Sequence, residues 1–485
     1  MGNELSAAVP GLVQPVESYL ADLGPAYHFI QGLGSTRFLK VAKALKRDAE
    51  LTEGFVVVKV LALHDPSFSL RPYRDQLEAI RDRLLASPHA SPNCAPFQLI
   101  RETEKAGLMV EKRWLAFQLL QGLAQAQAVG IAHGDIKPDN LLISGSHWLR
   151  ITDFAPFKPA FLPLDNPSDF TYFFDTSRKG YAYLAPERFC SKPPSSQSLL
   201  AQPSSASFLT HAMDIFAAGC VLVELFCEGT VAFRLGELLR YRDSQQPGRR
   251  EAHLNTILSH ISADTDLQAL IRDMLRVEAK QRPSAEQLLE AYRGSVFPEP
   301  FYTFHYPFHR PFAALPVMPV QKRIFRLEEE SEQLLDRLSK PDGILLLPLL
   351  TSSVRGLKSI GDKRKALRLM LLVAGRSSAD VSLHRILPYA AFLLADPAGR
   401  VRAESLNVVV GLLGEASSGP VDARVLPDYL LPKLQPLTGD SAVLVRLTLA
   451  ARLPALATIA LRMIVRKETL PKGWYFFLIW LVLGK

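Results

Sequence analysis

The stretch that decides the fold reads His133-Gly134-Asp135-Ile136-Lys137-Pro138-Asp139-Asn140, and Thr152-Asp153-Phe154 follows it downstream. Asn140 lies five residues after Asp135, and Asp153 lies eighteen residues after it. Phosphoryl transfer needs one carboxylate to orient a hydroxyl group, and an amide and a second carboxylate to hold magnesium ions beside a nucleotide. The three residues have these chemical types in the required order, so the stretch predicts a site for phosphate transfer.

A third motif, Ala185-Pro186-Glu187, completes a series typical of the catalytic segment of a protein kinase. We therefore predict an α+β bilobal protein-kinase fold. Asp135, Lys137 and Asn140 are the catalytic candidates. Asn140 and Asp153 are the candidate ligands of Mg²⁺, which would accompany ATP or another nucleotide.

Three further residues are predicted to brace this domain. Glu187 and Arg282 resemble the buried ion pair of the carboxy-terminal lobe of a kinase, and Asp214 resembles the carboxylate that supports the catalytic loop. In the amino-terminal part, the β-branched run around Lys59 predicts a buried strand with one functional lysine, which would pair with phosphate. Glu78, on a helix expected to follow, is the candidate ion-pair partner of Lys59.

The loop expected to cover the phosphates reads Leu33-Gly34-Ser35-Thr36-Arg37-Phe38-Leu39-Lys40-Val41. Thr36 and Leu39 stand where a typical loop has glycine, and glycine is the residue that lets the backbone approach phosphates closely. The loop is therefore a poor phosphate cover. The nucleotide-binding candidates are Leu33, Gly34, Phe38, Val41, Lys59 and Glu78.

Other departures make catalysis doubtful. Gly134 replaces the arginine that usually precedes the catalytic aspartate, so no cation is available there to grip a phosphate on the activation segment. Ala155 replaces the glycine that usually follows Asp153-Phe154. Only 57 residues separate Glu78 from Asp135, which leaves too little chain for a complete nucleotide hinge.

Composition limits the possible partners. The net charge is +8 and the pI is about 9.2. A solvated basic surface explains this charge, and attraction to acidic lipid headgroups or an acidic partner is the alternative. No nucleic-acid motif is present, so we expect no nucleic-acid partner.

Met1-Gly2-Asn3-Glu4-Leu5-Ser6 matches the pattern for N-myristoylation of Gly2. One such chain binds membranes only marginally, so a second anchor or a membrane-bound partner is expected.

The amino-acid composition of the chain changes after the kinase-like part. Prolines and aromatic residues between Phe297 and Val320 predict an irregular strap that lies on a surface. Beyond it, Val401-Arg402 recurs as Val445-Arg446, 44 residues later, within the period of HEAT repeats. An ordinary helical bundle is the alternative.

We predict five segments. They are an N-terminal myristoylated segment (1–25), a protein-kinase-like domain (26–296), a strap and linker (297–340), a truncated all-α solenoid of HEAT-type repeats (341–470) and an atypical apolar tail (471–485).

Taken together, these motifs resemble one family, the regulatory subunit of class III phosphatidylinositol 3-kinase. The resemblance is carried by Met1-Gly2-Asn3, the loop from Leu33 to Phe38, the two catalytic stretches, Phe173-Phe174-Asp175-Thr176-Ser177-Arg178, Ala212-Met213-Asp214-Ile215-Phe216 and the segment from Phe297 to Phe304. That family has a protein-kinase-like domain, HEAT repeats and a carboxy-terminal β-propeller. The propeller has no counterpart here, and neither has the hinge, so the sequence resembles a truncated form.

The resemblance implies a serine/threonine protein-kinase-like regulatory subunit that scaffolds the lipid kinase and supports phosphatidylinositol 3-phosphate formation in autophagy and endosomal or vacuolar trafficking. The implied partners are the class III catalytic subunit, a Beclin-type coiled-coil subunit and endosomal or autophagic membranes. The implied location is the cytoplasm and, through N-myristoylation, the surface of late endosomes and autophagosomes. Two alternatives stay open: an active ATP-dependent kinase that acts on its lipid-kinase partner, and an inactive truncated fragment.

Overall fold

The structure is a computed structural model, and it describes residues 27–35, 39–47, 53–61, 108–154, 158–164, 166–175, 179–190, 209–227, 229–244, 246–261, 263–314, 316–330, 343–414 and 425–464. The chain divides into two compact units. The first consists of Met1–Arg83, Ala155–Ala182 and Arg188–Phe208. The second consists of Leu84–Phe154, Tyr183–Glu187 and Leu209–Lys485.

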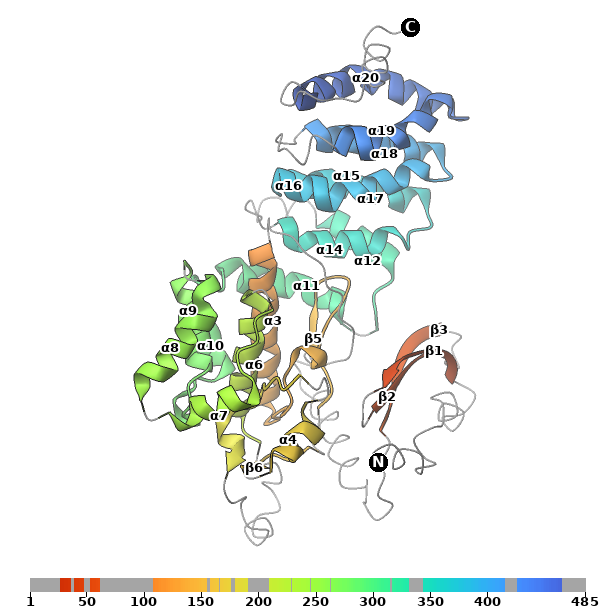
Figure 1. Ribbon diagram of the computed structural model, residues 1–485. Helices are drawn as coiled ribbons and strands as arrows, with labels where there is room; N and C mark the ends of the chain where they lie inside the picture. Colours follow the sequence, from red (N-terminus) through yellow and green to blue (C-terminus); the bar gives the residue numbers. More distant parts are fainter. Residues whose placement is uncertain are drawn as a thin grey trace, which may run out of the picture. The chain divides into compact units, whose positions relative to one another are not determined.

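A three-stranded antiparallel sheet opens the first unit, in the order β1 (Tyr27–Ser35), β2 (Leu39–Arg47) and β3 (Glu53–Leu61) (Figure 1). β2 pairs with β3 without interruption, whereas the pairing of β1 with β2 shifts register twice, between Phe29 and Gln31 and between Gly32 and Gly34. β3 contains the run of valines, a residue type that favours strands. A strand is therefore present around Lys59, as predicted.

The first unit also contains a short parallel pairing of β6 (Leu162–Pro163) with β7 (Phe189–Cys190). Helix α4 (Pro167–Phe173) follows β6, and the Asn166 side chain accepts a hydrogen bond from the Ser168 amide at 3.2 Å. An asparagine cap with proline in the first turn is a favourable start for a helix, since both residues suit unpaired backbone N–H positions.

The second unit begins with a helical lobe around α3 (Leu108–Ala128), which packs against α6 (His211–Phe226) and α10 (Ala285–Ala291). Its core contains fully buried apolar side chains of α3 and α6, among them Trp114, Phe117 and Phe216. The other elements of this lobe are η2 (Pro138–Asn140), β4 (Leu141–Ile143), β5 (Leu149–Ile151), η3 (Pro186–Arg188), α7 (Leu235–Asp243), α8 (Pro247–Ile257), η4 (Leu258–Ile261), α9 (Thr265–Met274) and η5 (Ala279–Gln281).

The proline-rich strap lies on α3, as expected, but it is helical rather than irregular. A π-helical turn, η6 (Phe301–His305), runs into α11 (Tyr306–Ala313). Proline at the start of α11 needs no N–H partner, so it begins the helix instead of breaking it. The Trp114 ring lies 5.2 Å from the Phe301 ring and 5.4 Å from the His309 ring. Burial of aromatic residues at helical spacing outweighs the high proline content.

Helices α12 to α20 stack in pairs beyond the strap (Figure 1). α15 packs on α18, and α18 packs on α20. The elements are α12 (Val320–Glu329), α14 (Gly343–Val354), α15 (Ile360–Ala374), α16 (Ala379–Val381), η7 (Ser382–Ile386), α17 (Leu387–Phe392), η8 (Leu393–Ala395), α18 (Gly399–Gly414), η10 (Val425–Leu430), α19 (Leu431–Leu434), η11 (Gln435–Gly439) and α20 (Val443–Ile464).

The 44-residue sequence repeat corresponds to a repeated contact. Arg402 donates to the carbonyl of Asp396 at 2.7 Å, and Arg446 donates to the carbonyl of Asp440 at 2.6 Å. Arg402 also forms two hydrogen bonds with the Asp440 carboxylate, at 2.6 and 2.7 Å, and so joins one helical pair to the next. Each aspartate is thus the equivalent of the other in its own pair.

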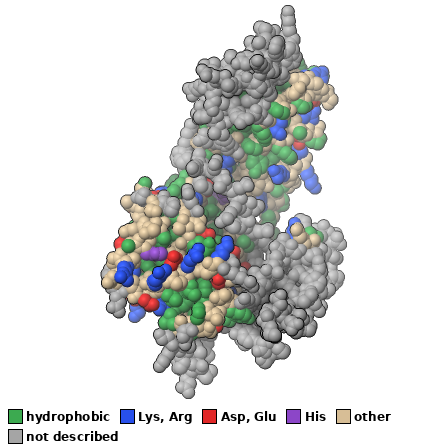
Figure 2. All heavy atoms as spheres, in the orientation of Figure 1, with side chains coloured by type: hydrophobic (Ala, Val, Ile, Leu, Met, Phe, Trp, Pro, Cys, Tyr) green, Lys and Arg blue, Asp and Glu red, His purple; other side chains and the backbone are tan. Residues whose placement is uncertain are grey.

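One helix in the described part of the chain, α20, has a window, Val443–Ala460, that is long and apolar enough to cross a membrane by length and composition. A helix in the core of a helical stack passes the same test, and α20 packs on α18. Figure 2 shows Lys and Arg side chains spread over both the lobe and the repeats and mixed with other residue types, which agrees with a solvated basic surface.

Candidate functional site

The catalytic candidates lie in a loop of the second unit that is closed by a hairpin. β4 pairs with β5 so that Leu141 is opposite Ile151. The amide of Thr152 donates to the carbonyl of Asn140 at 2.9 Å, which extends this pairing by one residue. The hairpin therefore brings Asn140, at the end of the loop, next to Asp153, which follows Thr152.

Asp135, Lys137 and Asn140 form one polar group. The side-chain amide nitrogen of Asn140 donates to the Asp135 carboxylate at 3.0 Å and to the Asp135 carbonyl at 2.7 Å. The Lys137 ammonium lies 3.3 Å from the same carboxylate. All three residues are at most 6% exposed, so their side chains are held in place rather than free in solvent. The three residues predicted to be catalytic are thus brought together.

His133 fixes the start of this loop. Its Nε2 lies 2.7 Å from the carbonyl of Thr152, and its Nδ1 accepts from the Asp135 amide at 3.2 Å. Burial lowers the pKa of the His133 imidazole, although the nearby Asp214 carboxylate opposes this effect. A neutral ring with its proton on Nε2 satisfies both contacts. His133 therefore joins the loop to the end of β5.

Asp214 supports the loop through hydrogen bonds to its backbone. Its two carboxylate oxygens accept the amides of His133 and Gly134, at 2.6 and 2.8 Å. Gly134 has φ +79°, a left-handed conformation, and a Cβ added there would lie 2.5 Å from a methyl group of Leu209. Glycine therefore replaces the usual arginine for a structural reason, because it fits both the left-handed backbone and the space beside Leu209. The structure places Asp214 where a loop-supporting carboxylate is needed.

Asp153 is one of two described non-glycine residues with positive φ, at +63°. Such a conformation is costly outside glycine and clusters at functional sites. The side chains of Asp153 and Asn140 offer carboxylate and amide oxygens, the hard ligands that Mg²⁺ prefers, and Mg²⁺ commonly takes only one or two protein ligands besides phosphate oxygens and water. The donor set therefore fits the metal, although no cluster of three or more His, Cys, Asp or Glu side chains occurs among the described residues.

The predicted ion pair between Glu187 and Arg282 is present. The two guanidinium nitrogens of Arg282 bond the two carboxylate oxygens of Glu187, both at 2.7 Å. Arg282 also donates to three backbone carbonyls, and its side chain is fully buried. A bidentate pair of this kind has a defined geometry. It fixes the segment around Glu187 to the helical lobe.

The nucleotide-binding candidates of the first unit share one row of its sheet. Gly34 is opposite Val41 in the pairing of β1 with β2, and Val41 is opposite Lys59 in the pairing of β2 with β3. Leu33 lies at the register shift just before Gly34. Phe38, Glu78 and Gly2 lie outside the described residues, as does Ala155.

The segment that includes α4 is held by its own side chains. The two carboxylate oxygens of Asp175 accept the backbone amides of Lys179 and Gly180, at 3.0 and 2.9 Å. Arg188 donates to the carbonyls of Pro159 and Ala160, at 2.7 and 2.8 Å. An aspartate and an arginine thus organise the described part of this segment.

Sequence reasoning missed one polar cluster, which joins the helical lobe to the repeats. Arg385 of η7 donates to the Glu111 carboxylate at 2.6 Å, although 274 residues separate them. The Nδ1 of His147 lies 3.1 Å from the other oxygen of Glu111, within ion-pair distance but off the line of a good hydrogen bond. No motif marks these residues, because their proximity arises only from the packing of distant helices.

Comparison with known proteins agrees with this architecture. The family model described as "Protein kinase domain" matches residues 95–292, and the model described as "PIK3R4-like, middle domain" matches residues 346–473. The predicted fold class, a kinase fold followed by a helical solenoid-like part, is therefore confirmed.

Curated relatives match nearly the whole chain. This chain is 31% identical to the putative serine/threonine-protein kinase VPS15 of Komagataella pastoris and 30% identical to the serine/threonine-protein kinase VPS15 of Arabidopsis thaliana. Both matches cover 95% of this chain and 38% of the relative. It is 29% identical to the serine/threonine-protein kinase VPS15 of Saccharomyces cerevisiae, over 90% of this chain and 36% of the relative. The chain thus spans little more than a third of these relatives. It combines a protein kinase domain with a PIK3R4-like middle domain and is homologous to VPS15 serine/threonine-protein kinases over nearly its whole length.

Proposed function

We propose that the chain is a protein-kinase-like regulatory subunit that scaffolds a class III phosphatidylinositol 3-kinase at endosomal and autophagic membranes and thereby supports phosphatidylinositol 3-phosphate formation. The proposal rests on the resemblance and on the PIK3R4-like middle domain. A Beclin-type coiled-coil subunit is the expected third member of the complex.

One observation supports the scaffold hypothesis: ion pairs and hydrogen bonds connect the helical lobe to the repeats at several points. Besides the Arg385–Glu111 ion pair, the strap helix α11 links the two: Arg150 of the lobe donates to the carbonyl of Ala313 in α11 at 2.5 Å, and the Nε2 of His309 in α11 lies 3.0 Å from the carbonyl of Leu345 in the repeats. Stacked helical repeats offer extended surfaces for protein partners. A lobe fixed to such a stack can hold a partner in one orientation.

The residues of the catalytic loop suit the handling of a phosphate donor. Asp135 would accept the proton of a substrate hydroxyl, and Lys137 and Asn140 hold its carboxylate in place. Asn140 and Asp153 would hold Mg²⁺, which neutralises phosphate charge when bound with a nucleotide. Under the scaffold hypothesis, this group serves to stabilise the lobe around a nucleotide.

The scaffold reading is tested by separating assembly from catalysis. The lipid kinase is co-expressed with wild-type chain, Asp135→Asn or the control Asp139→Asn, whose aspartate lies in the same loop but is exposed. Co-purification and lipid phosphorylation are measured. We expect both to be the same for all three chains. Loss of lipid phosphorylation by a folded Asp135→Asn variant that still co-purifies would argue against a scaffold.

Membrane anchoring through a myristoyl group on Gly2 is a separate part of the proposal. The Gly2→Ala variant cannot accept the acyl chain, so we expect it to leave the membrane fraction when expressed without partners. The measurement is sedimentation with liposomes after co-expression with an N-myristoyltransferase. Equal sedimentation of the variant and the wild-type chain would rule out the acyl anchor.

A second candidate function is an active serine/threonine protein kinase, and the assembled group of Asp135, Lys137 and Asn140 favours it. Its test is phosphate transfer from labelled ATP to the lipid-kinase partner and to generic peptides. Transfer that Asp135→Asn abolishes and Asp139→Asn retains would support this function. Equal background with all three chains would leave the scaffold reading alone.

A further inference from the structure

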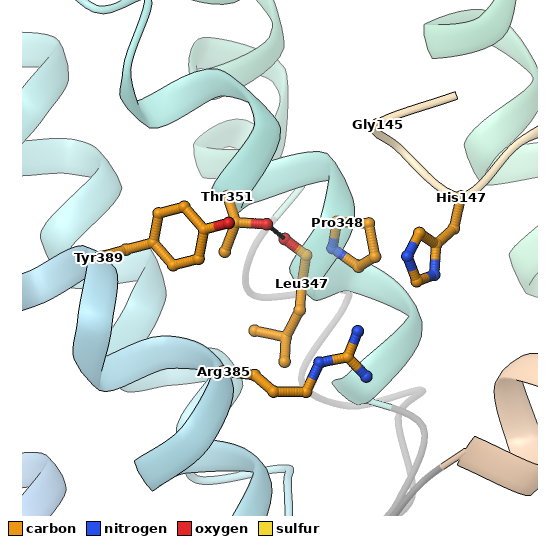
Figure 3. Close-up of a pocket in the computed structure, with 7 residues that line it drawn as sticks. All are labelled: Gly145, His147, Leu347, Pro348, Thr351, Arg385 and Tyr389. Atoms are coloured by element: carbon orange, nitrogen blue, oxygen red, sulfur yellow. Dashed lines mark hydrogen bonds between the residues drawn. The ribbon is translucent and has the colours of Figure 1, made fainter. Parts of the chain in front are cut away.

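A pocket of about 260 Å³ lies where the helical lobe meets the repeats (Figure 3). Three segments distant in sequence line it: the turn of the β4–β5 hairpin, helix α14, and the η7–α17 segment. The lining residues are Gly145, His147, Leu347, Pro348, Thr351, Arg385 and Tyr389. In Figure 3, Arg385 and His147 extend toward the same space beside Pro348, one from the repeats and the other from the hairpin.

The lining carries two basic side chains and no acidic one. Behind it, the buried carboxylate of Glu111 contacts both, at 2.6 Å from Arg385 and 3.1 Å from His147. Burial raises the pKa of the Glu111 carboxyl, but the contacts with His147 and Arg385 outweigh it, so the pKa is lowered overall. Glu111 is thus an ionised positioning residue that holds both basic groups at the pocket.

Some N–H donors of the Arg385 guanidinium have no partner among the described residues. A guanidinium carries five N–H groups, and only the Nη1 of Arg385 has a partner in the described part of the chain. Its side chain is 33% exposed, so the remaining donors can be reached from the pocket. The hydroxyl of Tyr389 likewise has no hydrogen-bond partner among the residues that the structure describes. Both groups can bind an incoming oxygen atom.

His147 is held at the pocket in a strained conformation. Its φ is +54°, in the left-handed region that disfavours residues other than glycine. The carbonyl of Ser144 accepts its amide at 2.9 Å, and the side chain of Gln118 donates to its carbonyl at 3.0 Å. Such strain persists where the surroundings fix it, and it clusters at ligand sites.

We propose that this pocket binds the carboxylate of a glutamate side chain from an acidic peptide. Arg385 and Tyr389 would donate to the carboxylate. Leu347 and Pro348 would contact the aliphatic part of the side chain. The volume is below the range of roughly 300–1,000 Å³ usual for drug-sized ligands, and so it suits one side chain.

The binding test uses three probes on the full chain: acetyl-Gly-Glu-Gly-amide, the same peptide with Gln in place of Glu, and inorganic phosphate. Saturation-transfer-difference NMR follows the two peptides, and phosphate, which has no observable proton, is measured by how it displaces the Glu peptide. Because the Gln amide offers the guanidinium one neutral acceptor in place of two charged oxygens, the Glu peptide should bind at least about tenfold more tightly than the Gln peptide. Equal binding of the two peptides would overturn the proposal. Phosphate that binds as tightly as the Glu peptide would overturn the assignment to a peptide.

A matched pair of variants locates the site. Gly145 has no positive φ, and a Cβ added there would lie 3.5 Å from the Cβ of Ser352, an ordinary contact. Gly145→Asp and Gly145→Asn therefore both fold and differ only in charge. We expect Gly145→Asp to weaken the Glu peptide at least about fivefold through like-charge repulsion, and Gly145→Asn to stay within about twofold of wild type. Equal affinity of the two variants would place the peptide elsewhere.

A third variant tests the guanidinium. Arg385→Lys keeps the positive charge beside Glu111, and so it keeps the junction folded, but it loses the planar fork. We expect about tenfold weaker binding with Tm within a few degrees of wild type. The control is Arg355→Gln, because Arg355 is exposed and lies outside the pocket. Wild-type affinity in Arg385→Lys, or an equal loss in Arg355→Gln, would contradict a site built on Arg385.

Discussion

Replacement of Asp214 by asparagine should destabilise the catalytic loop by a predictable amount. The two carboxylate oxygens of Asp214 accept the amides of His133 and Gly134 at 2.6 and 2.8 Å, and Asp214 is only 3% exposed. Asparagine can accept one of these amides, but its NH₂ group then faces the other. One charge-assisted hydrogen bond is lost and one buried N–H is left unpaired, which together cost about 2–4 kcal/mol.

The loss can be measured as a change in Tm. At about 2–4 °C per kcal/mol, Asp214→Asn should melt roughly 4–16 °C below wild type. The control is Asp243→Asn, since the side chain of Asp243 is 62% exposed and only contacts its neighbour Arg242. That variant should stay within about 0.5 kcal/mol of wild type. If the two variants melted together, the assigned support of the loop by Asp214 would be wrong.

Three other predictions test the packing of the second unit. His305 is buried, neither of its ring nitrogens has a hydrogen-bond partner among the described residues, and burial lowers its pKa well below the usual value. Because the unfolded chain then binds a proton that the folded chain does not, the free energy of unfolding falls as pH drops below about 6.5. His305→Phe should make that fall shallower in urea titrations at pH 7.5 and 5.5. Arg402→Ala, which removes the bond between helical pairs, should cost about 1–3 kcal/mol, whereas Arg446→Ala should cost less than about 0.5 kcal/mol. Equal urea midpoints would contradict the stabilising role of the Arg402–Asp440 bond. Arg282→Lys should cost about 2–3 kcal/mol because lysine cannot reproduce the fork of hydrogen bonds, and an unchanged Tm would refute the bracing role.

The sequence was most informative where chemistry requires particular residue types at fixed spacing. Asp135 and Asn140 form one short loop, so their proximity in the structure follows from a spacing of five residues. The Val-Arg pairs 44 residues apart likewise correspond to equivalent positions, because each helical pair repeats the same turn. In both cases the signal is local or periodic.

Sequence reasoning failed where tertiary packing overrides local preference. The strap from Phe297 was predicted to be irregular from its prolines, but η6 and α11 are helical because burial against Trp114 favours one face of a helix. Gly134 was interpreted only as a lost arginine, since neither its φ nor its contact with Leu209 can be read from the sequence. The cluster of Glu111, His147 and Arg385 joins segments too distant for any local pattern to predict.

The central claim is that the chain holds an assembled phosphotransfer loop in its helical lobe. A crystal or cryo-EM map that resolves side chains tests it most directly. We expect the Asn140 amide to lie within hydrogen-bond distance of the Asp135 carboxylate, near 3.0 Å, and Asp153, which follows the hairpin, to have positive φ. A map in which Asp135, Asn140 and Asp153 point to separate surfaces would contradict it.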